Sequence, residues 1–199
     1  MMDRATGLVL TSPDGVRYRF DPGALCLELL LTGGPGEIAR YESLHEPAGL
    51  LEWVVHSRLR PTPELRVSGE ELAETRRARD ALWRLVWART GRSEASVEDL
   101  GVLNAAAARP PLAPALYADG VGWAAGPAAG EQLLSTVARD AVALLGGPYA
   151  GRIRECGAHD CRLVFVDTSR PGRRRWCSMG RCGNRNKVRA LRARQRLEG

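Results

Sequence analysis

Apolar and polar residues alternate near the start of the chain, a spacing of two that is typical of β-strands. Residues 16–20 carry this pattern, residues 7–10 form a short apolar run, and the two segments flank a Ser-Pro-Asp-Gly turn signal at residues 12–15. The pattern predicts a β-hairpin. A third apolar segment, residues 25–31, fits either a strand or a short buried helix.

Helical spacing takes over in the middle of the chain. Pro47 is suited to the first turn of a helix, which we expect to reach about residue 56. Ser68 and Glu71 have the spacing of a capping box, and the helix that they begin should extend to about residue 89. Arg79 lies on the apolar stripe of this helix, so it needs a charged partner if it is buried.

Two further helices and a second hairpin follow. We expect a helix capped by the segment that begins at Ser96, a hairpin over residues 113–125 and an amphipathic helix over residues 131–145. A Gly-Gly-Pro sequence at residues 146–148 ends the last helix and marks the boundary between two parts of the chain. The fold class expected is α+β, with a mostly helical domain over residues 1–147 that contains short hairpins and a small module over residues 148–199.

The charge is divided unevenly between these two parts. The chain of 199 residues has a net charge of +6. Residues 151–199 hold 14 Lys and Arg against 4 Asp and Glu, or +10, so residues 1–150 carry −4. Such asymmetry predicts a polyanionic partner for the basic part. No apolar run is long enough for a membrane span and no secretion signal is visible, so we expect a cytoplasmic protein without membrane contact.

Four of the five cysteines fall in the basic part, at Cys156, Cys161, Cys177 and Cys182. Two close pairs with a longer segment between them can close a tetrahedral shell around one zinc ion per chain, because thiolates are good zinc ligands. Iron–sulfur ligation is an alternative with less support. His159 lies between the first two cysteines and is expected to face solvent, and Cys26 is expected to be a buried packing thiol.

The sequence between the cysteine pairs predicts how the module folds. Residues 163–166 should form a strand, residues 167–172 a turn and residues 173–176 a return strand, followed by a helix from about Met179 to Arg196. This is a treble-clef-like layout. A segment of this length has little apolar core, so we expect the metal to hold it together.

The residues Cys182-Gly183-Asn184-Arg185 spell the signature of the CGNR zinc-finger family, and residues 150–196 resemble that family almost throughout. The first part of the chain resembles the ABATE domain that precedes this finger in such proteins. Relatives begin that domain with a Phe-Val-Asn-Thr-like segment, whereas residues 27–32 here contain no Asn. The resemblance implies a zinc-bound bacterial transcription regulator, responsive to stress.

Basic residues around the cysteines are the candidates for contact with nucleic acid, because Arg and Lys neutralise phosphates. Asn184 is expected instead to orient the zinc loop through hydrogen bonds, and Asn186 could reach a base edge. The nucleic-acid candidates are Arg173, Arg174, Arg175, Arg181, Arg185, Asn186, Lys187, Arg189 and Arg192.

These observations together predict a DNA-binding transcriptional regulator whose partner is duplex DNA. An RNA- or protein-binding zinc module is the alternative, since a fold does not fix a function. The residue patterns of catalytic sites are missing from the sequence, and four cysteines leave zinc no open position, so we expect no enzyme. The N-terminal domain is expected to sense a small-molecule effector or to mediate a homodimer.

Overall fold

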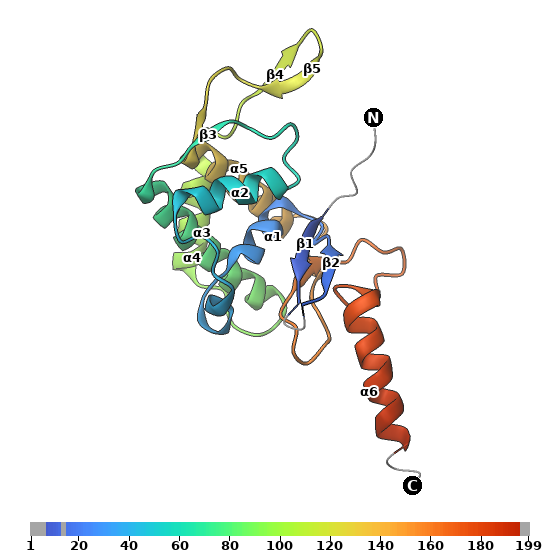
Figure 1. The fold of residues 1–199 in the computed structure, drawn as a ribbon. Helices are drawn as coiled ribbons and strands as arrows, with labels where there is room; N and C mark the ends of the chain where they lie inside the picture. Colours follow the sequence, from blue (N-terminus) through green and yellow to red (C-terminus); the bar gives the residue numbers. More distant parts are fainter. Residues whose placement is uncertain (1–6, 13–14, 196–199) are drawn as a thin grey trace. The chain divides into compact units, whose positions relative to one another are not determined.

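The computed structural model describes residues 7–12 and 15–195, with the side chains of residues 190–194 left aside. The chain divides into two compact units. One unit is Ala24–Gly151, here called the helical unit. The other combines the segment up to Gly23 with the segment from Arg152, and we call it the cysteine unit (Figure 1).

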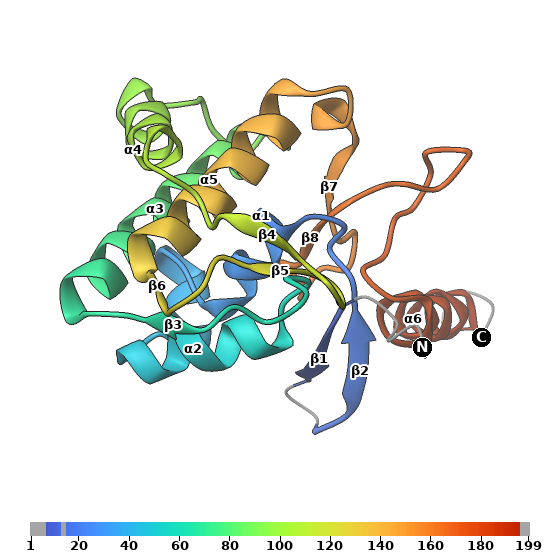
Figure 2. The ribbon, with the colours of Figure 1, turned by 90° about the horizontal axis from the view of Figure 1, so that it is seen from above.

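The helical unit is a layered bundle in which α5 (Gly130–Gly146) packs against α1 (Leu25–Leu29), α3 (Gly69–Arg89) and α4 (Val97–Ala108) (Figure 2). Its only parallel strand pair among the described residues joins Leu65–Arg66 (β3) to Ala128–Ala129 (β6). The antiparallel hairpin of β4 (Pro114–Tyr117) and β5 (Gly120–Trp123) extends away from the helices (Figure 1). The other elements are η1 (Leu30–Thr32), η2 (Gly36–Tyr41) and α2 (Pro47–His56).

Local signals place most of these helices where the sequence predicted them. Helix α2 begins at Pro47, and α4 begins after Ser96, whose hydroxyl accepts the Glu98 N–H at 3.2 Å. The capping box is formed, since Ser68 Oγ accepts the Glu71 N–H at 3.1 Å and the Glu71 carboxylate accepts the Ser68 N–H at 2.7 Å. The α+β, mostly helical prediction is confirmed.

The ambiguous apolar segment after the first hairpin is helical. Helix α1 is buried on all sides, because α5 covers it and Trp53 of α2 donates its Nε1–H to the Glu28 carbonyl at 3.2 Å. Burial around the whole circumference explains why the sequence shows an apolar run and no helical period. Glu28 itself is 0% exposed, and its carboxylate accepts the main-chain N–H of Arg58 at 2.8 Å and its Nε–H at 3.0 Å.

Arg79 is the most deeply buried cation of the helical unit, at 1% exposure. Its guanidinium donates two parallel bonds to the Glu42 carboxylate, at 2.8 and 2.7 Å, and further bonds to Asp80. The hydrogen bonds from Arg79 lower the pKa of Glu42 to about 2. Arg79, the charged residue in the apolar stripe of α3, therefore forms an ion pair that attaches the segment after η2 to α3.

The glycine-rich segment before η2 is part of the core. Trp83 of α3, 2% exposed, donates its Nε1–H to the Gly33 carbonyl at 2.8 Å. A Cβ atom at Gly34 would collide with the indole ring of Trp83. The glycine at this position lets the chain lie directly against the tryptophan, so the segment is a tightly packed connection.

The cysteine unit is built from segments far apart in sequence. Strands β1 (Leu8–Thr11) and β2 (Arg17–Phe20) form the predicted hairpin, and β7 (Ile153–Glu155) pairs antiparallel with β8 (Val164–Val166). A π-helical turn, Met179–Gly183, leads into α6 (Asn184–Gln195).

A hydrogen bond from Val166, at the end of β8, joins the two segments of the cysteine unit, and one from Asp167 holds β8 to the start of the second segment. The N–H of Val166 donates to the Pro22 carbonyl at 2.8 Å, and the N–H of Asp167 donates to the Arg152 carbonyl at 2.8 Å. The expected domain boundaries, residues 1–147 and 148–199, stay a prediction about independent folding. By contacts, the first hairpin belongs with the cysteines.

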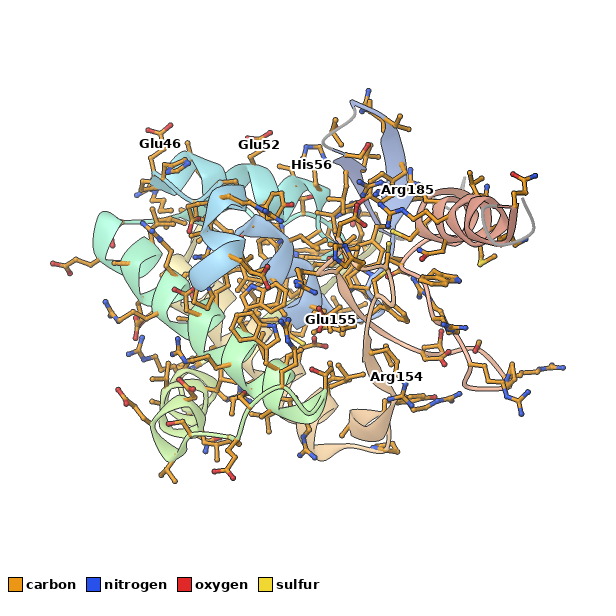
Figure 3. The ribbon with its side chains drawn as sticks, turned by 90° about the horizontal axis from the view of Figure 1, so that it is seen from below. Glu46, Glu52, His56, Arg154, Glu155 and Arg185 are labelled. Carbon is orange, nitrogen blue, oxygen red and sulfur yellow. The ribbon has the colours of Figure 1, made fainter. Side chains whose placement is uncertain are left out.

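Replacing Glu42 with Gln should destabilise the helical unit by about 3 kcal/mol, because a buried guanidinium loses the carboxylate that accepts two bonds from it and retains only Asp80 as a charged partner. Glu52→Gln is the matched control, since Glu52 lies on the exposed face of α2 (Figure 3). Urea unfolding measures the difference.

The ionised Glu42 carboxylate, whose pKa is depressed by Arg79, stabilises the fold fully above pH 4.5, and this contribution should disappear as pH falls towards about 2. Equal stability of the two variants at neutral pH would contradict the assignment.

Candidate zinc centre and basic surface

Four cysteine side chains converge in the cysteine unit. Their sulfur atoms all lie within 4.8 Å of one another, and every one of the four is buried. The Sγ atom of Cys177 lies 3.8 Å from that of Cys161 and 3.5 Å from that of Cys182. Among the described residues, this is the group of side chains with the composition and spacing of a metal site.

The separations fit one tetrahedral ion. With zinc–sulfur bonds of about 2.3 Å, the edge of the tetrahedron is about 3.8 Å. The observed separations lie around this value, and four thiolates are the donor set of structural zinc sites. Four protein ligands complete the shell, so the ion would hold the chain together and would leave no position for a substrate or a reacting water molecule.

The electrostatics of the cluster favour a cation among the sulfurs. Hydrogen bonds from the Cys161 and Cys177 side chains lower the pKa of Cys156 to about 2. The same hydrogen bonds raise the pKa of Cys161 to about 12 and raise that of Cys177 strongly. One thiolate thus suppresses ionisation of its neighbours, and a divalent ion among the sulfurs would reverse this effect.

Main-chain hydrogen bonds place the first three cysteines. The N–H of Cys156 donates to the Leu163 carbonyl at 2.8 Å, which closes the loop between β7 and β8. The next N–H, from Gly157, donates to the Arg175 carbonyl at 2.8 Å. The N–H of Cys177 points at the Cys156 sulfur at 3.3 Å. The segment of the second cysteine pair is therefore held directly against the first pair.

The hairpin that carries the cysteines differs from the predicted one. Strand β8 pairs with β7, so Cys156 and Cys161 lie in the loop between paired strands, and residues 173–176 form no strand. The cause is Asp167, which is 0% exposed. Its carboxylate accepts the N–H and Oγ–H of Ser169 and the N–H of Arg174, so it takes up a donor that a strand ladder would use.

Arg174 supports the zinc centre from inside the unit. Its guanidinium lies 4.0 Å from the centre of the Phe165 ring. It donates to the carbonyl of Trp176 at 3.1 Å and to that of Cys177 at 2.7 Å. Because it is occupied in this way, Arg174 holds the loop that presents Cys177, whereas the sequence placed it among the nucleic-acid contacts.

Some of the other predicted contact residues pair with groups of the cysteine unit and some are exposed, and Arg189 is both paired and exposed. Arg185 and Arg189 both pair with Asp160, which lies between the first two cysteines, and Arg181 donates to the Tyr18 hydroxyl at 2.9 Å. Arg185 lies at the start of α6 (Figure 3). The side chains that the structure leaves exposed are those of Arg173, Arg175, Lys187 and Arg189.

Both asparagines of the signature region bond to the zinc loop. Asn184 donates its Nδ2–H to the Gly180 carbonyl at 3.3 Å, and Asn186 donates to the carbonyl of the ligand Cys182 at 2.9 Å. The side chain of Arg192 lies outside the described residues.

Sequence reasoning missed Tyr18, Asp160 and Asp167. Asp160 and Asp167 stand out only as rare acidic residues in a basic segment, and that contrast was the available signal. Tyr18 gave no signal, because its partner Arg181 lies at the other end of the chain.

The histidines contribute no catalytic arrangement to the part of the chain that the structure describes. His45, His56 and His159 are all exposed and lie apart in the sequence. His56 shares the outer face of α2 with Glu52 (Figure 3). His159 faces solvent, as predicted, and the four sulfurs form the cluster without it.

Geometry and chemistry define a protein with a helical body and a four-cysteine zinc module. Residues 23–148 match the ABATE family, described as "Putative stress-induced transcription regulator", and residues 152–195 match the CGNR zinc finger. The chain belongs to the ABATE family and carries a CGNR zinc finger that binds one zinc ion.

Neither matched family is a family of enzymes. No curated protein matches the chain at a significant level. Within residues 7–12 and 15–195, no helix is both long and apolar enough to cross a membrane.

Removing zinc should unfold the cysteine unit and leave the helical unit folded, because the small core of the cysteine unit depends on the metal. Cys177→Ser should have the same effect as a chelator. Metal analysis should find one zinc per chain in the wild-type protein. Hydrogen exchange should show that protection is lost in residues 152–195 and in β1–β2, while α3 and α5 stay protected. Cooperative loss of both units would contradict this separation.

Arg174→Lys should lower zinc affinity by about 10- to 100-fold, because a lysine cannot stack on Phe165 and also donate to two carbonyls. Competition with a chromophoric chelator measures the affinity. Arg173→Lys is the matched control on the neighbouring, exposed residue and should leave zinc affinity unchanged. A loss of equal size in both variants would show that Arg174 has no special role at the zinc centre.

Proposed function

We propose that this protein is a cytoplasmic, stress-responsive transcriptional regulator that binds duplex DNA through its cysteine unit. The observation that carries the proposal is the set of exposed cations beside the zinc centre. Arg173 and Arg175 follow the turn after β8, and Lys187 and Arg189 lie on α6. The family description and the charge of +10 on residues 151–199 support the same function.

The zinc centre gives this charge a fixed geometry. Arg175 lies two residues before the ligand Cys177, and Lys187 lies on α6, which directly follows the π-helical turn of the ligand Cys182. Cysteine ligation and the bonds from Asn184 and Asn186 fix the start of α6 relative to the preceding loop. Two cationic segments held rigidly can contact two stretches of phosphate backbone at a smaller entropic cost than a flexible basic tail.

The helical unit has the regulatory role in this proposal. The apolar space among α1, α3, α4 and α5 has no room for a water molecule, so it holds no effector in this conformation. The β4–β5 hairpin carries a cross-strand pair, Leu116 and Val121, that is 83% and 67% exposed. An apolar pair on an extended hairpin favours contact with another protein chain, such as a second copy, over the capture of a small molecule.

The test is a titration of duplex DNA at several salt concentrations. Each neutralised phosphate contributes about 0.9 to the slope of log affinity against log salt. Arg173→Ala combined with Arg175→Ala should therefore weaken binding to all sequences and make the slope shallower by about 1.8. The control is Arg66→Ala with Arg77→Ala, which removes two exposed arginines of the helical unit.

The partner used for comparison decides between the candidate functions. Duplex DNA bound no better than heparin, even after sequence selection, would contradict DNA recognition. Preference for structured RNA would favour the RNA-binding alternative. Recovery of a protein partner in the absence of nucleic acid would favour an interaction module.

A further inference from the structure

The N-terminal hairpin lies outside both family matches. Strands β1 and β2 end at Phe20, whereas the matched segments are residues 23–148 and 152–195. Yet the contacts of the hairpin assign it to the cysteine unit. The hairpin is thus part of the cysteine unit but lies outside both matched families. Its role therefore has to be inferred from its own residues.

The hairpin has two chemically different faces. Its register pairs Leu8 with Phe20 and Leu10 with Tyr18 on the inner face. The alternate pairs, Val9 with Arg19 and Thr11 with Arg17, point outward and are exposed. Since successive strand residues point to opposite faces, both arginines of β2 lie on the outer face. Their cross-strand neighbours are short, so the two guanidinium groups are the longest side chains there.

Tyr18, on the inner face, and Pro22, just after β2, attach the hairpin to the zinc module. Phe20 is 1% exposed, and the carbonyl of Pro22 accepts the Val166 N–H at 2.8 Å. Tyr18 packs on Arg181, whose guanidinium carbon lies 4.8 Å from the ring centre. The same guanidinium donates to the Tyr18 hydroxyl at 2.9 Å. Burial raises the pKa of Tyr18 to about 12.

Arg181 connects the hairpin to the metal site, because the next residue is the ligand Cys182. Figure 1 and Figure 2 both show β2 beside the start of α6, which agrees with this bond. Arg181 is therefore committed to the attachment, although the sequence placed it among the nucleic-acid contacts. The zinc centre fixes the hairpin in addition to the loop of Arg175 and the helix of Lys187.

We propose that the outer face of the β1–β2 hairpin is part of the nucleic-acid-binding surface, with Arg17 and Arg19 contacting phosphates of the bound duplex. The inference rests on the proposed function. A two-stranded ribbon is narrow enough to lie along a groove of DNA, and its outward cations then meet the backbone. Arg19 donates to the Gly7 carbonyl at 3.0 Å, which holds its side chain against the ribbon.

The alternative is that these arginines only keep an exposed ribbon soluble and unpaired, a common role for charges at sheet edges. The two roles differ in one measurable quantity. A cation that neutralises a phosphate changes the salt dependence of binding, whereas a solubilising cation does not.

The experiment uses the full-length, zinc-loaded protein and a short random-sequence duplex. Arg17→Ala with Arg19→Ala should make the slope of log affinity against log salt shallower by about 1.8, since two phosphate contacts are lost. Zinc content and thermal unfolding should match those of the wild type, because both side chains lie on the exposed face. Arg17→Lys with Arg19→Lys retains both charges and should restore most of the slope.

The control is again the Arg66→Ala, Arg77→Ala pair, which removes equal charge from the helical unit. A hairpin variant that binds like this control would overturn the inference and leave the proposed function standing, provided that the Arg173, Arg175 variant still lowers the slope. Lysine substitutions as weak as alanine would also overturn it, because the contact would not be one of charge. No salt-dependent binding of duplex by the wild-type protein would remove the proposed function and the inference together.

Discussion

Four thiols held within 4.8 Å of one another cannot all ionise unless a cation lies among them. Other contacts of the cysteine unit hold the four thiols in place. Arg174 donates to the carbonyl of one ligand, Cys177, and Asn186 donates to the carbonyl of another, Cys182. Apart from the cysteines, the buried apolar side chains of this unit are few, among them Phe20, Ile153 and Phe165. We therefore expect metal binding and folding to be coupled in this part of the molecule.

The arginine count overstates the charge available to a partner. Arg174 lies on Phe165, Arg181 holds Tyr18, and Arg185 pairs with Asp160. In the helical unit, Arg79 is buried against Glu42 in the same way. Arginine is suited to these positions because its planar group can stack on a ring and donate several directed bonds at once. The arginines of this sequence therefore include some that stabilise the fold through internal contacts and some that are exposed cations. Burial in the structure distinguishes the two kinds, and the sequence does not.

The features that the sequence predicted well depend on neighbours in the chain. Pro47, the Ser68–Glu71 capping box and the four-cysteine spacing are all signals between residues close together in the sequence. The helix starts and the set of metal ligands could therefore be predicted. The return strand over residues 173–176 was predicted wrongly, because Asp167 takes up a main-chain donor that strand pairing needs. The attachment of the first hairpin could not be predicted either, since Tyr18 meets a partner more than 160 residues away.

The end of β8 gives the chain an unusual order of assembly. Val166 bonds to the carbonyl of Pro22, where the chain leaves the cysteine unit, and Asp167 bonds to the carbonyl of Arg152, where the chain returns to it. The points of exit and return are therefore neighbours in space. In topological terms, residues 24–151 are an insertion within a small zinc-binding fold. A ribosome adding roughly 5–20 residues per second needs on the order of ten seconds to make that insertion. Throughout this interval Tyr18 and Pro22 have been synthesised, while Arg181 and Val166, which will bond to them, have not.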